Sequence, residues 1–267
     1  MRVLAIGAHP DDCEIAIGGT AALWGLRGDE VHFVSLTDGC RGHYRPEYHR
    51  EPALLIERRQ REAAGAAAIV GASYECLGMP DGEVFVTPGA TEAVVQLIRR
   101  VGPDLVLCHR PVDYHRDHRY TARLVLDAAY MLTVPFYCPA VPHLARMPII
   151  ASWWDEFRES GRFRRDVTVP LNKVWDTKVA MVAAHESQFY EWLPYNRGVL
   201  DAVPADQTAR RAWLGEWLAA WHGDLAARCG LAPTTRAEAF QISEYGRQPL
   251  PGELRDLFPP GARLRQD

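Results

Sequence analysis

The chain of 267 residues lacks several features that would place it in a specialised class of protein. No apolar stretch reaches the ~18 residues of a membrane span, and the N-terminal residues show no signal-peptide pattern. The six cysteines are scattered without a Cys-x-x-Cys pair, which indicates reduced thiols rather than a disulfide framework or a cysteine zinc site. The formal charge of -4 gives no electrostatic footprint for nucleic acid or anionic membrane. We therefore expect a cytoplasmic protein without a membrane span or a nucleic-acid partner.

The first half of the sequence alternates short apolar runs with helical patterns. Strands are expected at residues 2–8, 30–37, 74–77 and 104–108, and helices at residues 14–26, 52–70, 89–100 and 118–132. Alternation of this kind is typical of βαβ units. It predicts an α/β fold with a doubly wound, mostly parallel, Rossmann-like sheet.

The chain after Pro135 is less regular, because four prolines between residues 135 and 148 indicate loops. It still offers helices at 175–184 and 206–228 and a late strand near 239–243. With 48% hydrophobic and 24% charged residues, the composition is that of an ordinary globular protein. We expect a single domain over residues 1–267, with its core in 1–135 and a C-terminal elaboration in 136–267.

Two polar clusters follow two of the expected strands. His9-Pro10-Asp11-Asp12 comes directly after the first strand, and the cluster from Asp113 to His118 follows the strand at 104–108. In a doubly wound sheet these two strands flank the point where strand order reverses, and ligands bind there outside the carboxyl ends of the strands. We therefore expect the two clusters to lie close together.

The two clusters together contain the residue types of a catalytic metal site. A carboxylate at a helix start is often only a cap, but zinc enzymes use three His, Asp or Glu ligands and leave one position open. His9, Asp12 and His118 match such a set, and Asp11 is placed to act as the general base. His115 could stabilise an oxyanion if Asp117 holds its ring as an imidazolium.

Other functional classes are excluded or stay open at this point. The glycines near the first strand lack the Gly-x-Gly-x-x-Gly pattern of a dinucleotide site, and no Gly-x-Ser-x-Gly elbow is present. Two histidines and one carboxylate also suit non-haem iron(II) enzymes, although the adjacent Asp11 favours hydrolysis. A non-catalytic carbohydrate-binding module with a vestigial site is the remaining alternative.

With these residues in view, the sequence resembles the PIG-L/LmbE-like family of zinc-dependent N-acetylglucosaminyl deacetylases. The resemblance is strongest in residues 1–135 and covers most of the chain. It depends on six motifs: Ala8-His9-Pro10-Asp11-Asp12-x-Glu14, Asp113-Tyr114-His115-x-Asp117-His118, Ser35-Leu36-Thr37-Asp38-Gly39, Arg59-x-x-Glu62, His185-x-Ser187-Gln188 and Ala237-Glu238-Ala239-Phe240.

The resemblance implies roles for particular residues. His9, Asp12 and His118 would bind one zinc ion per chain, with Fe²⁺ or another divalent ion as the alternative. Asp11 would be the general base, and His115 with Asp117 the charged pair that stabilises the tetrahedral intermediate. Arg59 would help to shape the site. Family members often form homo-oligomers, so the resemblance also makes a homo-oligomer an expectation.

The substrate is the least determined part of the prediction. Arg116 replaces the usual family proline, and Cys40 with Arg41 replaces an acidic-small pair, both near the expected substrate entrance. The implied chemistry favours a small N-acetylglucosamine-type molecule, and an amide of a thiol-sugar conjugate is the alternative. Tyr44 is a candidate for stacking on a sugar ring, with loop packing an equal interpretation, and His185 is a candidate for binding substrate hydroxyls.

Overall fold

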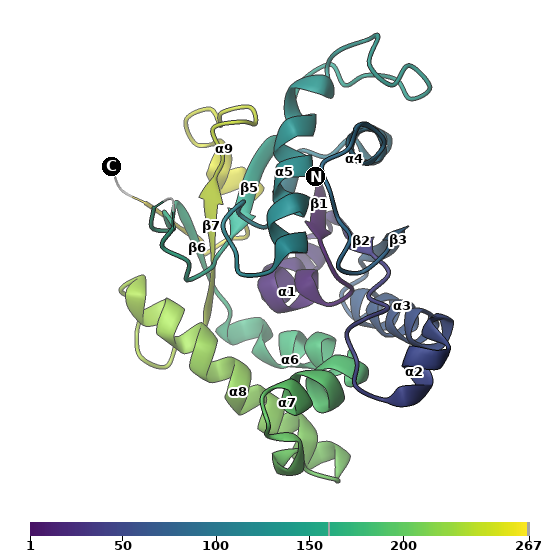
Figure 1. The fold of residues 1–267 in the computed structure, drawn as a ribbon. Coiled ribbons are helices and arrows are strands. Elements are labelled where there is room, and N and C mark those ends of the chain that lie inside the picture. Colours follow the sequence, from purple (N-terminus) through teal and green to yellow (C-terminus); the bar gives the residue numbers. More distant parts are fainter. Residues whose placement is uncertain (160, 266–267) are drawn as a thin grey trace.

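The computed structural model describes residues 1–159 and 161–265, and eight strands within them form one central sheet (Figure 1). Their order across the sheet is β3-β2-β1-β4-β5-β7-β6-β8. The strands are β1 (Arg2–Gly7), β2 (Glu30–Thr37), β3 (Ser73–Met79), β4 (Leu105–Cys108), β5 (Ile149–Trp153), β6 (Val167–Pro170), β7 (Ala237–Ile242) and β8 (Arg263–Leu264). The first five run parallel, and the other pairings are antiparallel.

Helices cover both faces of the parallel half. They are α1 (Asp12–Arg27), α2 (Pro46–Arg50), α3 (Pro52–Ala68), α4 (Pro88–Val101) and α5 (Arg116–Met131). Alternate residues of β1 point to opposite faces: Val3 and Ala5 pack in the core under α1, whereas Leu4 and Ile6 pack in the core under α4 and α5. The doubly wound, mostly parallel α/β fold is thereby confirmed, with the strand order reversing between β1 and β4.

The C-terminal part of the chain adds the antiparallel strands and a helical layer. Its helices are α6 (Trp175–Ala183), the π-helix η2 (Ser187–Trp192), α7 (Leu193–Asn196), α8 (Gln207–Arg228) and α9 (Glu253–Leu257), with short 3₁₀ turns at Asn172–Val174 (η1) and Leu200–Ala202 (η3). In Figure 1, α6, α7 and α8 lie together at the bottom of the view, and α6 packs against α1. Among the described residues, no helix has both the length and the apolar character needed to cross a membrane.

The expected elements of the first half are present, with shifted ends. Helix α1 begins at Asp12 rather than near residue 14 and stops at Gly28, whose φ of 86° is left-handed. Helix α5 begins at Arg116, two residues before the expected start at residue 118, so His118 lies in its first turn. Strands β5 (IIASW) and β6 (VTVP) were not predicted, because segments of four or five residues are too short for a periodic pattern to identify a strand.

One buried ion pair connects the two halves of the chain. Glu238 on β7 accepts hydrogen bonds from the backbone N–H groups of Gly19 and Thr20 in α1 and pairs with Lys178 of α6. Lys178 and Glu238 are both almost fully buried. Because neither charge can reach water, the cost of burying each charge is offset by the opposite charge beside it. The pair thereby links α1 to the C-terminal layer.

Candidate active site

The two polar clusters meet at the carboxyl ends of β1 and β4. These strands pair in parallel register, so the loop after β1 and the loop after β4 leave the sheet side by side. Gly7, the last residue of β1, allows this close approach, because a Cβ there would lie 2.7 Å from Cβ of Asp12. The expected proximity of His9 and Asp12 to His118 is confirmed.

The three expected metal ligands present donor atoms to one point. His9 Nδ1 lies 3.2 Å from His118 Nε2 and 3.5 Å from Asp12 Oδ2, and His118 Nε2 lies 3.4 Å from Asp12 Oδ1. Zinc–nitrogen bonds of ~2.0–2.1 Å in a tetrahedron separate the ligand atoms by about 3.3 Å. The pair His9 Nδ1 and His118 Nε2 and the pair His118 Nε2 and Asp12 Oδ1 are therefore spaced like neighbouring ligands of a tetrahedral metal ion, whereas the 3.5 Å contact of His9 is with the other oxygen of Asp12. We call His9, Asp12 and His118 the metal centre.

Neighbouring groups orient each of these donors. Asp12 Oδ2 accepts backbone hydrogen bonds from Ala8 and His9, which leaves Oδ1 turned toward His118. His118 Nδ1 lies 3.1 Å from an oxygen of Asp113, so a proton on Nδ1 leaves the Nε2 lone pair free for a metal. Partners of this kind fix the tautomer and the ring orientation of metal-binding histidines.

The charges of the metal centre are strongly coupled. Burial alone would raise the pKa of Asp12, but the neighbouring His118 and His109 hold it well below its usual range. Burial alone would lower the pKa of His9, but Asp117, Asp12 and Asp81 raise it well above its usual value. Without a metal the site therefore attracts positive charge, as expected of a site that a divalent cation would occupy.

Asp11 stands beside the metal centre in a strained conformation. Its φ is 143°, a region that costs a non-glycine residue about 1–3 kcal/mol and is kept where contacts fix the side chain. Arg59 provides that contact, with a guanidinium nitrogen 3.2 Å from Asp11 Oδ2 and hydrogen bonds to the carbonyls of Pro10 and Gly39. Burial raises the pKa of the Asp11 carboxyl to about 6 despite the nearby Arg59, so it can exchange a proton near neutral pH.

Among the contacts of the described residues, the carboxylate of Asp117 does not meet the ring of His115, with which a charged pair was expected. The Asp117 carboxylate accepts the backbone N–H of Gly82 at 2.7 Å and lies 3.5 Å from His9 Nε2. It is the backbone N–H of Asp117 that contacts His115, by donating to Nδ1 at 3.2 Å. Burial and the nearby His9 and His118 lower the pKa of His115, which favours the neutral ring. Asp117 therefore orients the metal ligand His9, and a neutral His115 carries its proton on Nε2.

Two of the three expected substrate-binding residues lie elsewhere. His185 is fully buried beneath α1, with Nε2 3.4 Å from Glu14, so the expectation that it contacts substrate hydroxyls is wrong. Although burial alone would lower it, the pKa of His185 is raised because of Glu14. Tyr44 stacks on Tyr195 at 4.0 Å instead of reaching the cavity, so the packing interpretation holds. Arg59 does line the cavity, but its guanidinium is engaged with Asp11.

Three further polar residues lie at this site: His109 and Asp81, which were not expected from the sequence, and Asp113, which was part of the second polar cluster but was given no role. His109 stacks on His118 at 4.0 Å with Nε2 3.1 Å from Asp12, and burial lowers its pKa to about 4. Asp81 lies 3.4 Å from His9 Nε2, and Asp113 holds His118. His109 and Asp81 each come one or two residues after a parallel strand, so the strand-end rule that found His9 could also have found them.

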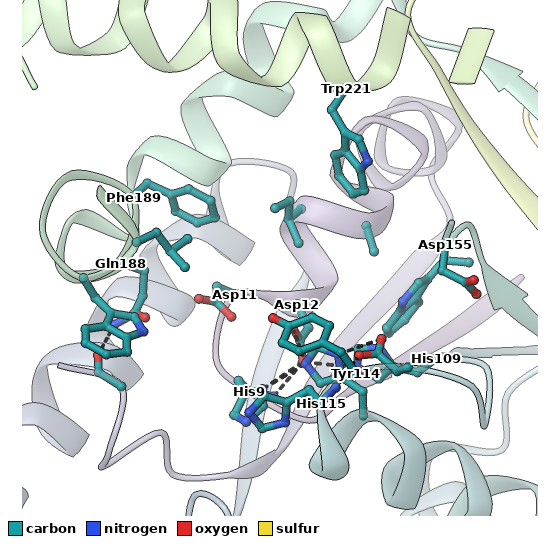
Figure 2. Close-up of a pocket in the computed structure, with 18 of the residues that line it drawn as sticks. His9, Asp11, Asp12, His109, Tyr114, His115, Asp155, Gln188, Phe189 and Trp221 are labelled. Atoms are coloured by element: carbon teal, nitrogen blue, oxygen red, sulfur yellow. Dashed lines mark hydrogen bonds and ion pairs between the residues drawn. The ribbon is translucent and has the colours of Figure 1, made fainter. Parts of the chain in front are cut away.

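A cavity of about 740 Å³ opens over the metal centre (Figure 2). Its floor is the polar cluster of the first half of the chain, and its walls include aromatic side chains of β5, the segment that follows β5, η2 and α8: Trp153, Trp154, Phe157, Phe189, Trp192, Trp217 and Trp221. The volume is within the ~300–1,000 Å³ of pockets for drug-sized ligands. The cavity can therefore hold a molecule larger than one acetylated sugar.

Two comparisons with known proteins bear on the family of this chain. Residues 4–129 match the profile of the PIG-L family, described as GlcNAc-PI de-N-acetylase. Diacetylchitobiose deacetylase of Thermococcus kodakarensis is 30% identical over 211 residues, which cover 74% of this chain and 76% of that protein. The chain belongs to the PIG-L/LmbE-like family.

The relatives of this PIG-L/LmbE-like chain differ in the reactions they are named for. 4-Oxalmesaconate hydratase of Pseudomonas putida is 28% identical over 201 residues, covering 74% of this chain and 78% of that protein. Among solved structures, N,N'-diacetylchitobiose deacetylase from Pyrococcus horikoshii has a TM-score of 0.71 at 22% identity, covering 91% of this chain and 84% of that one. The fold is therefore that of the family, and the reaction has to be inferred from the site.

Proposed function

We propose that this chain is a zinc-dependent N-deacetylase that removes the acetyl group from an N-acetylated amino sugar of the N-acetylglucosamine type. The observation that carries the proposal is the tetrahedral spacing of His9 Nδ1, Asp12 and His118 Nε2, with the carboxylate of Asp11 next to it. The relatives named as deacetylases of acetylated sugars support the substrate class.

The residues of this chain divide the reaction among them. A bound zinc ion would supply Lewis acidity to the amide carbonyl and bring the pKa of a water to ~7. Asp11 would take the proton of the attacking water and deliver it to the leaving nitrogen, a role suited to a carboxyl with a pKa of about 6. Nε2–H of His115 would donate to the developing oxyanion, and Arg59 would keep Asp11 in position.

The test is the release of free amine and acetate from a panel of N-acetylated amino sugars. Protein loaded with zinc is compared with protein treated with a chelator and with chelated protein to which zinc is returned. We expect turnover that the chelator abolishes and zinc restores. If zinc-loaded protein leaves every compound on the panel intact, the deacetylase proposal fails, and amides of thiol-sugar conjugates are tested next.

Hydration of an unsaturated dicarboxylate is the second candidate, because the hydratase relative matches as much of the chain as the deacetylase does. Such a substrate needs cations for its carboxylates, yet three of the four arginines that line the cavity are already paired: Arg41 with Glu83, Arg59 with Asp11 and Arg110 with Asp155. The cavity therefore favours the amide substrate. Loss of the absorbance of a conjugated dienoic diacid on addition of the zinc-loaded protein would reverse this preference.

Two further expectations from the sequence stay predictions. These are the cytoplasmic location and the homo-oligomer, and sedimentation of the purified protein would test the second. Zinc itself is proposed over Fe²⁺ because two imidazoles and one carboxylate at tetrahedral spacing suit it best. Metal analysis of protein purified without added metal would identify the ion.

A further inference from the structure

The cavity has two arms that lie on opposite sides of the metal centre. The order of the parallel strands is β3-β2-β1-β4-β5, and the metal centre stands over β1 and β4. One arm is lined by the loops that follow β2 and β3, and the other by the end of β5 and the loop that follows it. In Figure 2, Gln188 lies to one side of Asp11 and Asp12, and Asp155 and Trp221 lie to the other.

The arm next to β2 and β3 is polar. Its polar residues are Arg41, Arg59, Asp81 and Gln188, and Trp192 lies at its edge, with the indole nitrogen 3.8 Å from the position of a Cβ on Gly42. We call it the polar arm. Asp81 Oδ2 accepts the backbone N–H of Arg41, and Gln188 Nε2 donates to the carbonyl of Gly42. A carboxylate and an amide are groups that can bind the hydroxyls of a sugar ring, so this arm suits the amino sugar.

The arm next to β5 is apolar. It comprises Ala16, Trp153, Trp154, Phe157 and Trp221, and we call it the apolar arm. Trp154 packs on Trp221 at 5.3 Å, and Trp153 meets the ring of His109 edge-on at 4.6 Å. Because His109 stacks on His118, the apolar arm begins directly at the metal centre.

The charges in the apolar arm are satisfied by the protein itself. Arg110 binds both oxygens of Asp155 and also donates to the carbonyls of Phe157 and Gly161. A ligand at this wall therefore meets aromatic rings beside an ion pair that is closed within the protein.

An amide bound at the metal centre sends its two substituents in opposite directions. The amine and its sugar lie on one side of the carbonyl carbon, and the acyl chain lies on the other. If the sugar occupies the polar arm, the acyl chain enters the apolar arm. Three tryptophans and a phenylalanine line this arm, and the methyl group of an acetyl is too small to contact all four rings.

We propose that the apolar arm is an acyl subsite and that the preferred substrate is an amino sugar whose amide carries an alkyl or arylalkyl acyl group longer than acetyl. The inference rests on the proposed amidohydrolase function and deepens it. Water adds to the amide carbonyl, the C–N bond breaks, the amine takes the proton, and the longer carboxylic acid is released in place of acetate.

A series of acylated glucosamines tests the proposal. The zinc-loaded protein is given the N-acetyl, N-butanoyl, N-hexanoyl, N-octanoyl and N-phenylacetyl derivatives, and kcat/KM is measured from release of the free amine. We expect kcat/KM to rise about fourfold for each added methylene until the arm is filled, since each buried methylene contributes ~0.8 kcal/mol. N-phenylacetylglucosamine should also be cleaved faster than N-acetylglucosamine.

Two variants connect the preference to the arm. Trp221→Ala removes one wall and should lower the octanoyl-to-acetyl ratio of kcat/KM by about tenfold, which equals the loss of about two buried methylene groups. Ala16→Phe fills the arm without removing a core side chain and should make acetyl the preferred acyl group. The matched control is Trp213→Ala on the same helix, because Trp213 packs on Tyr190 outside the cavity and its loss should leave the ratio unchanged.

The outcomes separate this inference from the proposed function. Cleavage of N-acetylglucosamine with no gain for longer acyl groups would overturn the acyl subsite and leave the deacetylase proposal standing. A ratio that Trp221→Ala and Ala16→Phe leave unchanged would also overturn it. In a parallel series of alkyl glycosides of N-acetylglucosamine, a rise of kcat/KM with aglycone length that Ala16→Phe abolishes would assign the arm to the aglycone instead. Cleavage of no amide at all would reject the proposed function itself.

Discussion

Two parts of the active-site cavity differ in what holds their side chains in place. In the metal centre, polar contacts surround every ligand: Asp12 accepts two backbone N–H groups, His118 contacts Asp113, and Nε2 of His9 lies 3.4 Å and 3.5 Å from the carboxylates of Asp81 and Asp117. In the apolar arm, the contacts are between rings, such as Trp154 on Trp221. Hydrogen bonds fix an atom to within tenths of an ångström, whereas ring packing tolerates many shapes.

The metal centre and the apolar arm also come from different regions of the chain. The metal centre comes entirely from residues 9–118, within the span that matches the family profile. The apolar arm takes most of its wall from residues 153–221, beyond that span. We therefore expect substitutions in the first region to change the chemistry and substitutions in the second to change substrate preference.

The largest effect is expected from removing a metal ligand. His118→Ala should lose its zinc and reduce amide hydrolysis to background, because a site with two remaining ligands holds the ion poorly. The matched control is His32→Ala, since His32 lies on β2 and contacts Ser73 away from the cavity. Metal content by mass spectrometry and amine release are the readouts. Full zinc occupancy and activity in His118→Ala would remove this residue from the metal centre.

A smaller loss is expected from removing the base while keeping the metal. Asp11→Asn preserves the size of the side chain and should lower kcat by about 10²–10⁴, the usual contribution of a general base. Zinc content should be unchanged, because Asp11 contacts Arg59 rather than the three ligands. Wild-type kcat in this variant would show that another group accepts the proton.

A change in metal affinity alone is expected at Asp117. Asp117→Asn weakens the contact with His9 Nε2 and should weaken zinc binding about 10–100-fold, as is typical of groups that orient a metal ligand. Competition with a fluorescent chelator measures the zinc Kd, and Asp127→Asn on the exposed face of α5 is the control. An unchanged zinc Kd with a reduced kcat would restore the role beside His115 that the sequence suggested.

The smallest effect on turnover is expected from breaking the buried ion pair of Lys178 and Glu238, which connects the two halves of the chain. Lys178→Met leaves the buried carboxylate of Glu238 without its cation and should lower the free energy of unfolding by about 3–5 kcal/mol. The kcat of the folded protein should be unchanged, because Lys178 lies outside the cavity. Urea unfolding measures the difference, and Lys173→Met, the exposed one of the only two lysines, is the control. Equal unfolding midpoints would show that the ion pair contributes no net stability.

Parts of the fold and the site could be read from the chain directly. The alternation of strands and helices gave the parallel half, and the strand-end rule placed His9 and Asp12 beside His118. The same reading did not detect β5 or β6, because short buried strands after a proline-rich stretch carry no periodic signal. It also assigned Asp117 to His115, since the sequence shows that the two are adjacent but gives no information about the rotamers.

What the sequence determined by itself is the set of groups that parallel strands bring to one edge of the sheet, because topology fixes where strand ends lie. Only the tertiary structure decided which residue each side chain contacts: the carboxylate of Asp117 lies beside His9, and the ring of His185 is buried beside Glu14. It also decided that Trp154 and Trp221 pack against each other in one wall of the cavity. These choices depend on packing and burial between segments far apart in the chain, and such contacts leave no local pattern in the sequence.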